Sequence, residues 1–65
     1  QMDADSELVL KVIDEFDGVL PFNDKASPET IKREFHMSKN AFKRAVGHLL
    51  KEGKIKITDK SIERV

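Results

Sequence analysis

The sequence predicts a small α+β fold, in which three helices pack with a three-stranded antiparallel sheet. Three observations support this prediction. Apolar residues recur at three- and four-residue spacing in three separate segments, as in helices that bury one face. After Gly53 the apolar spacing changes to two, which is typical of strands. The chain has 65 residues, which leaves room for one hydrophobic core, so we expect a single domain over residues 1–65.

The first helix is expected to run from about Ser6 to Phe16, with Gly18 as its stop signal. Acidic residues Asp5 and Glu7 lie near its N-terminal end, where the helix dipole favours negative charge. Leu10 falls on the polar side of this helix, so we expect its side chain to be exposed. The residues on the apolar stripe are Leu8, Val9, Val12, Ile13 and Phe16.

A short extended segment follows at residues 19–22. Leu20 and Phe22 are two positions apart, so their side chains point to the same side and into the core. Pro21 lacks a backbone N–H and therefore restricts this segment to the edge of the sheet. We expect it to be the first of the three strands.

The second helix is expected from Pro28 to Phe35. Ser27 is its N-cap, and proline occupies the first helical position, where its missing N–H costs nothing. His36 and Met37 separate this helix from Ser38, the N-cap of the next one. The two helices therefore form a tight helix-turn-helix.

The third helix has the strongest signals, because Ser38 caps its start and Gly53 ends it in the left-handed conformation at C′. Its apolar face comprises Phe42, Ala45, Val46, Leu49 and Leu50. The opposite face carries Asn40, Lys43, Arg44, Gly47, His48 and Lys51, with Lys39 in the first turn. We expect this helix to be buried on one side and basic on the other, with no acidic residue on the basic side.

Two strands follow the third helix. The first alternates polar and apolar side chains, in the order Lys54, Ile55, Lys56, Ile57 and Thr58. A turn at Asp59 and Lys60 leads to the second strand, at residues 61–65, in which Ile62 points inward. The order of helix, short strand, helix, helix, strand and strand is that of the winged-helix arrangement.

The formal net charge of zero conceals an uneven distribution. Residues 1–31 contain eight acidic and two basic residues, whereas residues 32–65 contain ten basic and four acidic residues. The basic half is able to attract a polyanion. Attraction between the two halves within one small fold explains the same distribution equally well.

Several classes of function lack the residues that they require. The sequence has no cysteine, which excludes a disulfide, a thiolate metal site and a cysteine nucleophile. His36 and His48 lie on different expected elements, without an acidic residue at metal-ligand spacing. No glycine-rich phosphate loop or nucleophile motif occurs. We therefore expect no enzymatic activity, no metal and no cofactor. We also expect a cytoplasmic location without membrane contact, because no membrane-spanning run or signal peptide is recognised.

The segments LPFNDKASPETIKREF and MSKNAFKRAVGHLLKEGKIKIT resemble the C-terminal winged-helix domain of the CvfB/YitL family. The resemblance covers about residues 8–62, and its most specific parts are residues 20–28 and residues 38–44 with Gly47. It implies a bacterial RNA-binding regulator, called a virulence factor in staphylococci, with upstream OB-fold domains of the ribosomal S-one type. Gln1 as first residue likewise indicates a piece of a longer protein. This sequence departs from the family at His36, where glycine is usual, and histidine tolerates a positive φ better than most residues.

The residues predicted to contact nucleic acid lie on the third helix and the wing. They are Lys39, Asn40, Lys43, Arg44, His48, Lys51, Lys54, Lys56 and Lys60. A helix-turn-helix presents its second helix to a groove, and Gly47 on the outward side would let another backbone approach closely. The four phenylalanines fall in core phase, and Tyr and Trp are absent, so no ring is expected to stack on bases. Contact with the phosphate backbone of structured RNA or duplex DNA is expected, with weak sequence preference.

A second interpretation is a docking module that orients the neighbouring OB-fold domains. Its contact would be the acidic first helix or Leu10. A third interpretation, in which the lysines form an ordinary solvated surface, also accounts for the basic face. We expect a monomer in each case.

Overall fold

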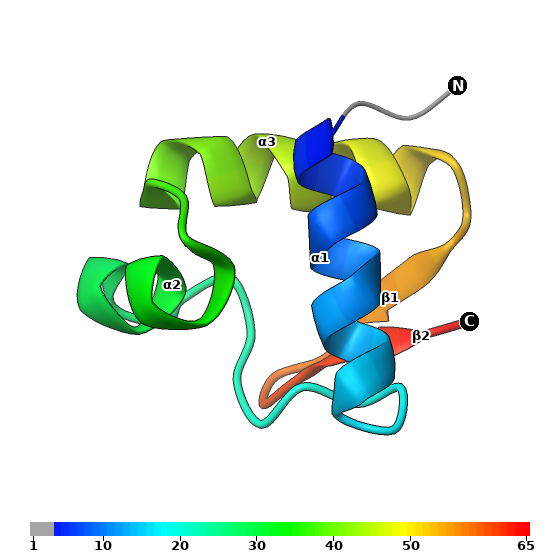
Figure 1. The fold of residues 1–65 in the computed structure, drawn as a ribbon. Helices are drawn as coiled ribbons and strands as arrows, with labels where there is room; N and C mark the ends of the chain where they lie inside the picture. Colours follow the sequence, from blue (N-terminus) through cyan, green and yellow to red (C-terminus); the bar gives the residue numbers. More distant parts are fainter. Residues whose placement is uncertain (1–3) are drawn as a thin grey trace.

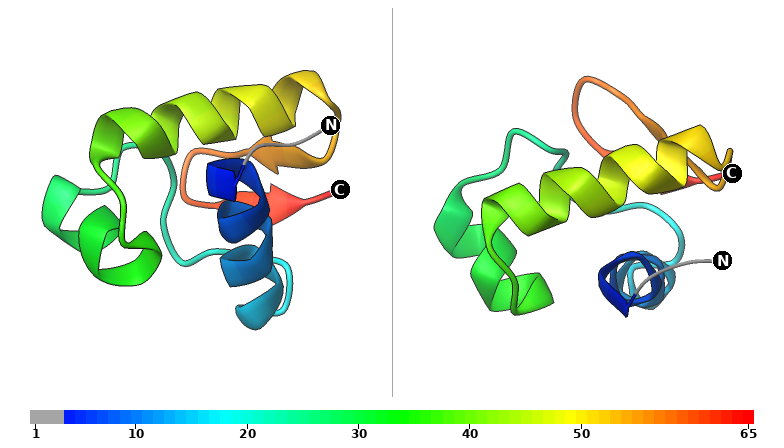
Figure 2. Two further views of the ribbon diagram at one scale, coloured as in Figure 1. Left: turned by 45° about the horizontal axis from the view of Figure 1, so that its top comes forward. Right: turned by 90° about the horizontal axis from the view of Figure 1, so that it is seen from above.

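The computed structural model describes residues 4–65, which form three helices and one antiparallel hairpin. In chain order the elements are α1 (Ala4–Glu15), α2 (Pro28–Phe35), α3 (Lys39–Lys51), β1 (Ile55–Ile57) and β2 (Ile62–Arg64). In Figure 1, α3 lies across the top, α1 crosses in front of it, and α2 lies below its N-terminal end. The view from above places α1 and the tip of the hairpin on opposite sides of α3 (Figure 2). This is the winged-helix arrangement that the sequence predicts.

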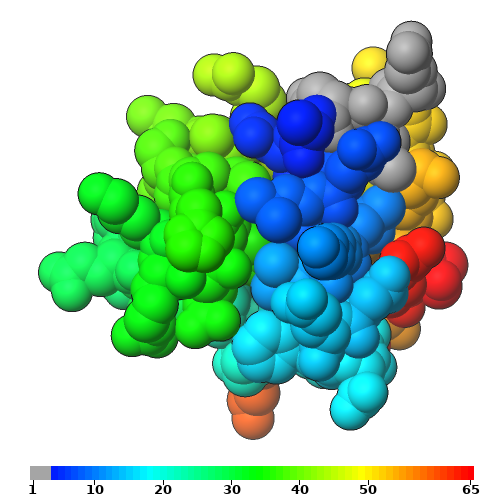
Figure 3. Space-filling model, viewed as in Figure 1, coloured from blue at the N-terminus to red at the C-terminus, as the bar shows by residue number. Residues whose placement is uncertain are grey.

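The core lies where the three helices meet the hairpin. Phe35 of α2 and Phe42 of α3 pack with their ring centroids 4.7 Å apart, and Phe22 meets Phe35 edge-on at 6.1 Å. Figure 3 shows α1 (blue) and the segment from α2 to α3 (green) in contact across the front of the molecule. The largest fully buried side chains are Phe35, Phe42, Ile13, Leu20, Ile31, Leu49 and Ile62.

The buried face of α1 differs from the prediction. The helix is already formed at Ala4, two residues before the predicted start. Leu10 is 7% exposed and Phe16 is 37% exposed, so both predictions for these residues were wrong. Because α1 packs against α2, α3 and β2, its buried arc is about 160° wide at about 100° per residue, and it reaches Leu10. Phe16 follows the last residue of the helix, where less protein covers it.

Local signals set the ends of α2 and α3 as predicted. The hydroxyl groups of Ser27 and Ser38 accept the backbone N–H groups of Thr30 and Ala41, respectively. At the end of α3, Gly53 has a φ of 72°, and the N–H of Lys54 donates to the Leu49 carbonyl at 3.0 Å. This is a Schellman motif, which joins α3 directly to β1.

Two residues other than glycine have a left-handed backbone. His36 has a φ of 58° at the end of α2, and its N–H donates to the Lys32 carbonyl at 2.9 Å. At the end of α1, Asp17 has a φ of 59°, and its N–H donates to the Asp14 carbonyl at 3.0 Å. Asp17 thus occupies the C′ position that the sequence assigns to Gly18. Histidine and aspartate are among the residues that tolerate this conformation.

Within residues 4–65 the sheet has two strands, and the segment predicted as its first strand forms only one bridge. β1 and β2 pair antiparallel, with Ile55 opposite Arg64 and Ile57 opposite Ile62. The segment at 19–22 adds a single bridge, between Val19 and Glu63, together with a 2.9 Å hydrogen bond from the Leu20 N–H to the Ile62 carbonyl. Pro21 has no N–H to continue the ladder, so the third strand is limited to this bridge.

Candidate nucleic-acid interface

The outward face of α3 is set by the residues that anchor its inward face. Phe42, Ala45, Val46 and Leu49 are buried, which fixes the rotation of the helix about its axis. Asn40, Lys43, Arg44, Gly47 and Lys51 are consequently exposed, and His48 is partly exposed. The structure therefore brings the six residues of the predicted basic face onto one side of α3.

The cations on this face form no ion pairs with the residues that the structure describes. Among residues 4–65, no carboxylate oxygen lies within 4.0 Å of the side-chain nitrogens of Lys39, Lys43, Arg44 or Lys51. Elsewhere in the domain such pairs do form. Arg64 of β2, for example, binds both carboxylate oxygens of Asp14 in α1, at 2.8 and 2.7 Å. The cations of α3 thus make no ion pair that stabilises the fold within residues 4–65.

An exposed apolar side chain lies beside the basic face. Leu50 is 41% exposed, so its predicted place in the core was wrong. On the helix it lies beside Gly47, three positions earlier. A Cβ atom added at Gly47 would meet no atom within 4 Å, so packing does not require glycine here. Gly47 and Leu50 are thus two uncharged positions, one on the basic face and one at its border.

His48 differs from the cations of the basic face in having an acidic neighbour among the described residues. Its Nε2 atom lies 3.8 Å from Oε1 of Glu52, the C-cap residue of α3. The sequence analysis placed no acidic residue on the basic side, and it overlooked this neighbour just past the helix end. The four-residue spacing of His48 and Glu52 was a signal that could have revealed the contact.

The wing carries fewer free charges than α3. Lys56 and Glu63 face each other across the hairpin, and the Lys56 Nζ atom lies 3.5 Å from the Glu63 carboxylate. Lys54 follows the end of α3, whereas Lys60 lies at the hairpin tip. Figure 1 shows this tip at the lower edge of the molecule, with α3 across the top. The structure therefore keeps the wing tip apart from the six residues on α3.

The described residues show neither a metal-binding cluster nor a membrane-spanning helix. No group of three or more His, Cys, Asp or Glu side chains that could hold a metal ion occurs within residues 4–65. The helices in this range are all too short or too polar to span a membrane.

The chain is similar to curated proteins from staphylococci. It is 46% identical, over 72 aligned positions, to conserved virulence factor B of Staphylococcus aureus strain N315 and of strain bovine RF122 / ET3-1. These alignments cover 100% of this chain and 24% of each relative. The chain therefore spans about a quarter of the length of the curated relatives it matches.

A solved structure has the same fold. It is the crystal structure of a multidomain protein with nucleic acid binding domains from Streptococcus pneumoniae TIGR4. The two are 37% identical with a TM-score of 0.93, over 100% of this chain and 23% of that protein. The family model described as the CvfB-like winged helix domain matches residues 7–63. The chain therefore belongs to the family of CvfB-like winged-helix domains.

Proposed function

We propose that this domain is an auxiliary nucleic-acid-binding module of a larger cytoplasmic RNA-binding regulator, without catalytic activity of its own. It binds through α3 to the phosphate backbone of structured RNA or of duplex DNA. The observation that carries this proposal is the set of exposed cations on α3 that have no partner within residues 4–65. A cation that the fold does not use remains available to neutralise a phosphate.

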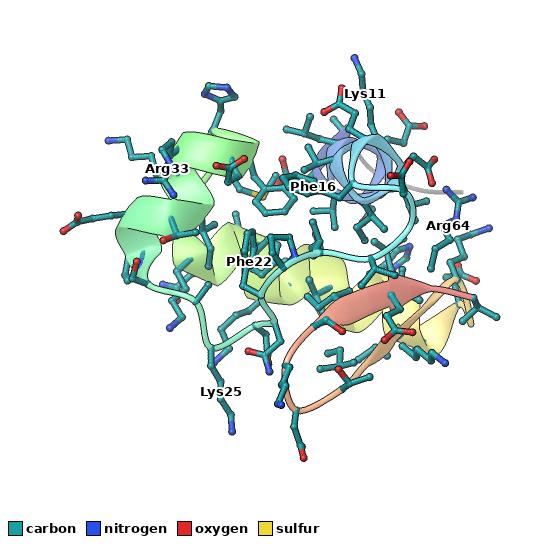
Figure 4. The ribbon with its side chains drawn as sticks, turned by 90° about the horizontal axis from the view of Figure 1, so that it is seen from below. Lys11, Phe16, Phe22, Lys25, Arg33 and Arg64 are labelled. Atoms are coloured by element: carbon teal, nitrogen blue, oxygen red, sulfur yellow. The ribbon has the colours of Figure 1, made fainter. Side chains whose placement is uncertain are left out.

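The side chains of α3 favour contact with phosphate over stacking on bases. Phe42, the one aromatic residue of α3, is completely buried. The exposed ring of Phe16 lies on the side of the molecule seen from below, with α3 behind it (Figure 4). Single-strand binders instead stack successive bases on exposed aromatic rings. We therefore expect double-stranded or structured nucleic acid to bind better than an unstructured strand.

An NMR titration tests the proposal directly. At low salt, the 65-residue chain is mixed in turn with short duplex RNA, duplex DNA and single-stranded RNA. We expect shifts at Lys43, Arg44 and Lys51, with a dissociation constant on the order of 10⁻⁴ to 10⁻⁶ M. Shifts scattered over the whole surface would indicate nonspecific attraction and contradict the proposal.

Charge reversal then identifies the face. A triple variant with Lys43, Arg44 and Lys51 changed to Glu should lose binding and most of its salt dependence. Its matched control reverses three other bases, Lys11, Lys32 and Arg33, and so has the same net charge. If the two triple variants bind equally well, α3 has no special part in recognition.

Docking of a neighbouring domain is the second candidate function. For its apolar contact, the structure favours residues other than Leu10. Leu10 is buried, whereas Phe16 and Val19 are 37% and 48% exposed. These two residues are adjacent, because the Val19 N–H donates to the Phe16 carbonyl at 3.2 Å. NMR shifts at Phe16 and Val19 when the rest of the protein is added, with none at α3, would favour this candidate.

A further inference from the structure

Asn23 joins the wing to the connection between α1 and α2. Its amide nitrogen donates to the carbonyls of Thr58 and Asp59, at 3.1 and 3.0 Å. Its amide oxygen accepts the backbone N–H of Lys25 at 2.9 Å. The side chain is 8% exposed, and both amide protons and the oxygen have a partner. A buried polar group with all its hydrogen bonds made fixes the segments that it connects.

A two-stranded hairpin is barely stable alone, and β2 is joined to the rest of the domain by the Leu20–Ile62 hydrogen bond and the Arg64–Asp14 pair. The tip of the wing lies beyond these contacts. Within the tip, the Thr58 hydroxyl accepts the N–H of Ser61 at 2.9 Å, which closes the loop on itself. These bonds shape the tip but do not attach it to the helices. In the tip, that attachment is made by the two carbonyls that Asn23 binds.

Asn23 also places two lysines at the same edge of the molecule. Lys60 follows Asp59 in the tip, and Lys25 follows Asn23 by two residues. Figure 4 shows Lys25 projecting at the edge where the hairpin tip lies. Both lysines are exposed, and neither is ion-paired to a residue in the range 4–65. Lys25 belongs to the acidic half of the sequence, and the sequence analysis did not include it in the interface.

We propose that Asn23 is a positioning residue that holds the wing tip, and that Lys25 and Lys60 beside it contact the nucleic acid bound by α3. This inference rests on the function proposed above. The hairpin tip and α1 lie on opposite sides of α3 (Figure 2). To contact both α3 and this edge, a polyanion must cross α3 and continue along the side of the domain away from α1. A wing fixed before binding loses little conformational entropy when it makes the contact.

The acidic residues at this edge limit the size of the effect. Asp24 and Asp59 are neighbours of the two lysines in the sequence, and they lower the positive potential there. Neither of them is ion-paired to Lys25 or Lys60. We therefore expect each lysine to neutralise at most one phosphate.

The test combines salt dependence with backbone dynamics. Binding of a labelled short RNA duplex to the 65-residue chain is followed by fluorescence anisotropy at several salt concentrations. Lys25→Gln and Lys60→Gln should each reduce the slope of log K against log salt by about 0.7 to 0.9. Lys11→Gln, an exposed lysine on α1, is the matched control and should leave the slope unchanged.

The same substitutions are then made together with Asn23→Ala. In that background the amide order parameters of residues 59 and 60 should fall from about 0.85 to below about 0.6. Lys25→Gln and Lys60→Gln should lose their effect, whereas Lys43→Gln should keep its own. Asn23→Ser replaces Asn23→Ala if circular dichroism shows a loss of helix in the alanine variant.

The outcomes separate this inference from the proposed function. If Lys43→Gln weakens binding but Lys25→Gln behaves like Lys11→Gln, the inference fails and the function of α3 stands. If Lys43→Gln has no effect either, the proposed function fails first. Unchanged order parameters in the Asn23 variants would overturn the positioning role, whatever the binding data show.

Discussion

α1 and α3 are both amphipathic helices, but their exposed faces use charge in different ways. The outward stripe of α1 carries Glu7, Lys11, Asp14 and Glu15, so that Lys11 has an acidic residue four positions away on each side. Asp14 is also bound by Arg64 at two oxygens. The outward face of α3 carries Lys43, Arg44 and Lys51, and no such partner is found for them within residues 4–65.

This difference separates the two faces by what their charges can contribute to the stability of the helix. Mixed charges at four-residue spacing stabilise a helix by themselves, by about 0.2 to 0.5 kcal/mol for each pair. A face with one sign of charge gives up that gain. The mixed charges of α1 can thus stabilise the helix itself, whereas within residues 4–65 the single-sign face of α3 has no such pairs.

The largest expected effect is a loss of stability when the buried side chain that holds α3 in place is removed. Phe42→Ala should cost about 3 to 5 kcal/mol, because the ring is fully buried and packs on Phe35. A chain of this size has a total stability of about 3 to 10 kcal/mol, so much of the protein would unfold. Phe16→Ala, at the partly exposed end of α1, should cost about 1 kcal/mol. Thermal denaturation followed by circular dichroism measures both, and equal losses would show that Phe42 does not anchor α3.

Smaller effects on stability and on binding are expected at Gly47, and they test whether the two helices differ in function. Gly47→Ala should stabilise the domain by about 1 kcal/mol, because the added Cβ has open space around it. Gly47→Leu should weaken binding of a short RNA duplex by about tenfold, since the added side chain would obstruct a backbone that approaches the outward face at this position. Ala4→Leu places the same leucine side chain at an exposed position of α1 and should not affect binding. Tight binding by Gly47→Leu would mean that no partner approaches the helix there.

The smallest expected effect concerns the first turns of the two helices. α1 has Asp5 and Glu7 in its first turn, whereas α3 has no acidic residue there and begins with Lys39. Lys39→Glu should raise stability by about 0.3 to 1 kcal/mol, because the helix dipole favours a negative charge at this end. If Lys39 serves recognition, the same variant also binds nucleic acid more weakly. Glu7→Lys, the mirror change on α1, should lower stability and leave binding intact.

Signals that act over a few residues were predicted well. Ser27, Ser38 and Gly53 each set a helix end through contacts within four residues, so the sequence alone is enough to find them. The basic face of α3 follows from helical periodicity in the same way. Pro21 indicated that the segment at 19–22 lies at an edge of the sheet, and it does. The segment pairs over fewer residues than expected.

Features that depend on distant parts of the chain were missed. Helical periodicity does not tell how many neighbours a helix has, so it failed for Leu10, which is buried by a wide packing arc, and for Leu50, which is not covered. The contact of Asn23 with the wing joins residues 35 and 36 positions apart. The Asp14–Arg64 pair spans 50 positions. Such partners are defined only once the fold has brought them together.

The division of α3 into two sets of residues has a consequence for how such domains diverge. Phe42, Ala45, Val46 and Leu49 hold the helix in place, and none of them belongs to its outward face. Apart from Gly47, outward positions can therefore change while the stability of the domain moves by about 0.5 kcal/mol or less at each. Two copies of this domain in different organisms could share every inward residue and differ in the partner they select. The inward residues keep α3 in its place in the fold, and the outward residues can be substituted without changing that place.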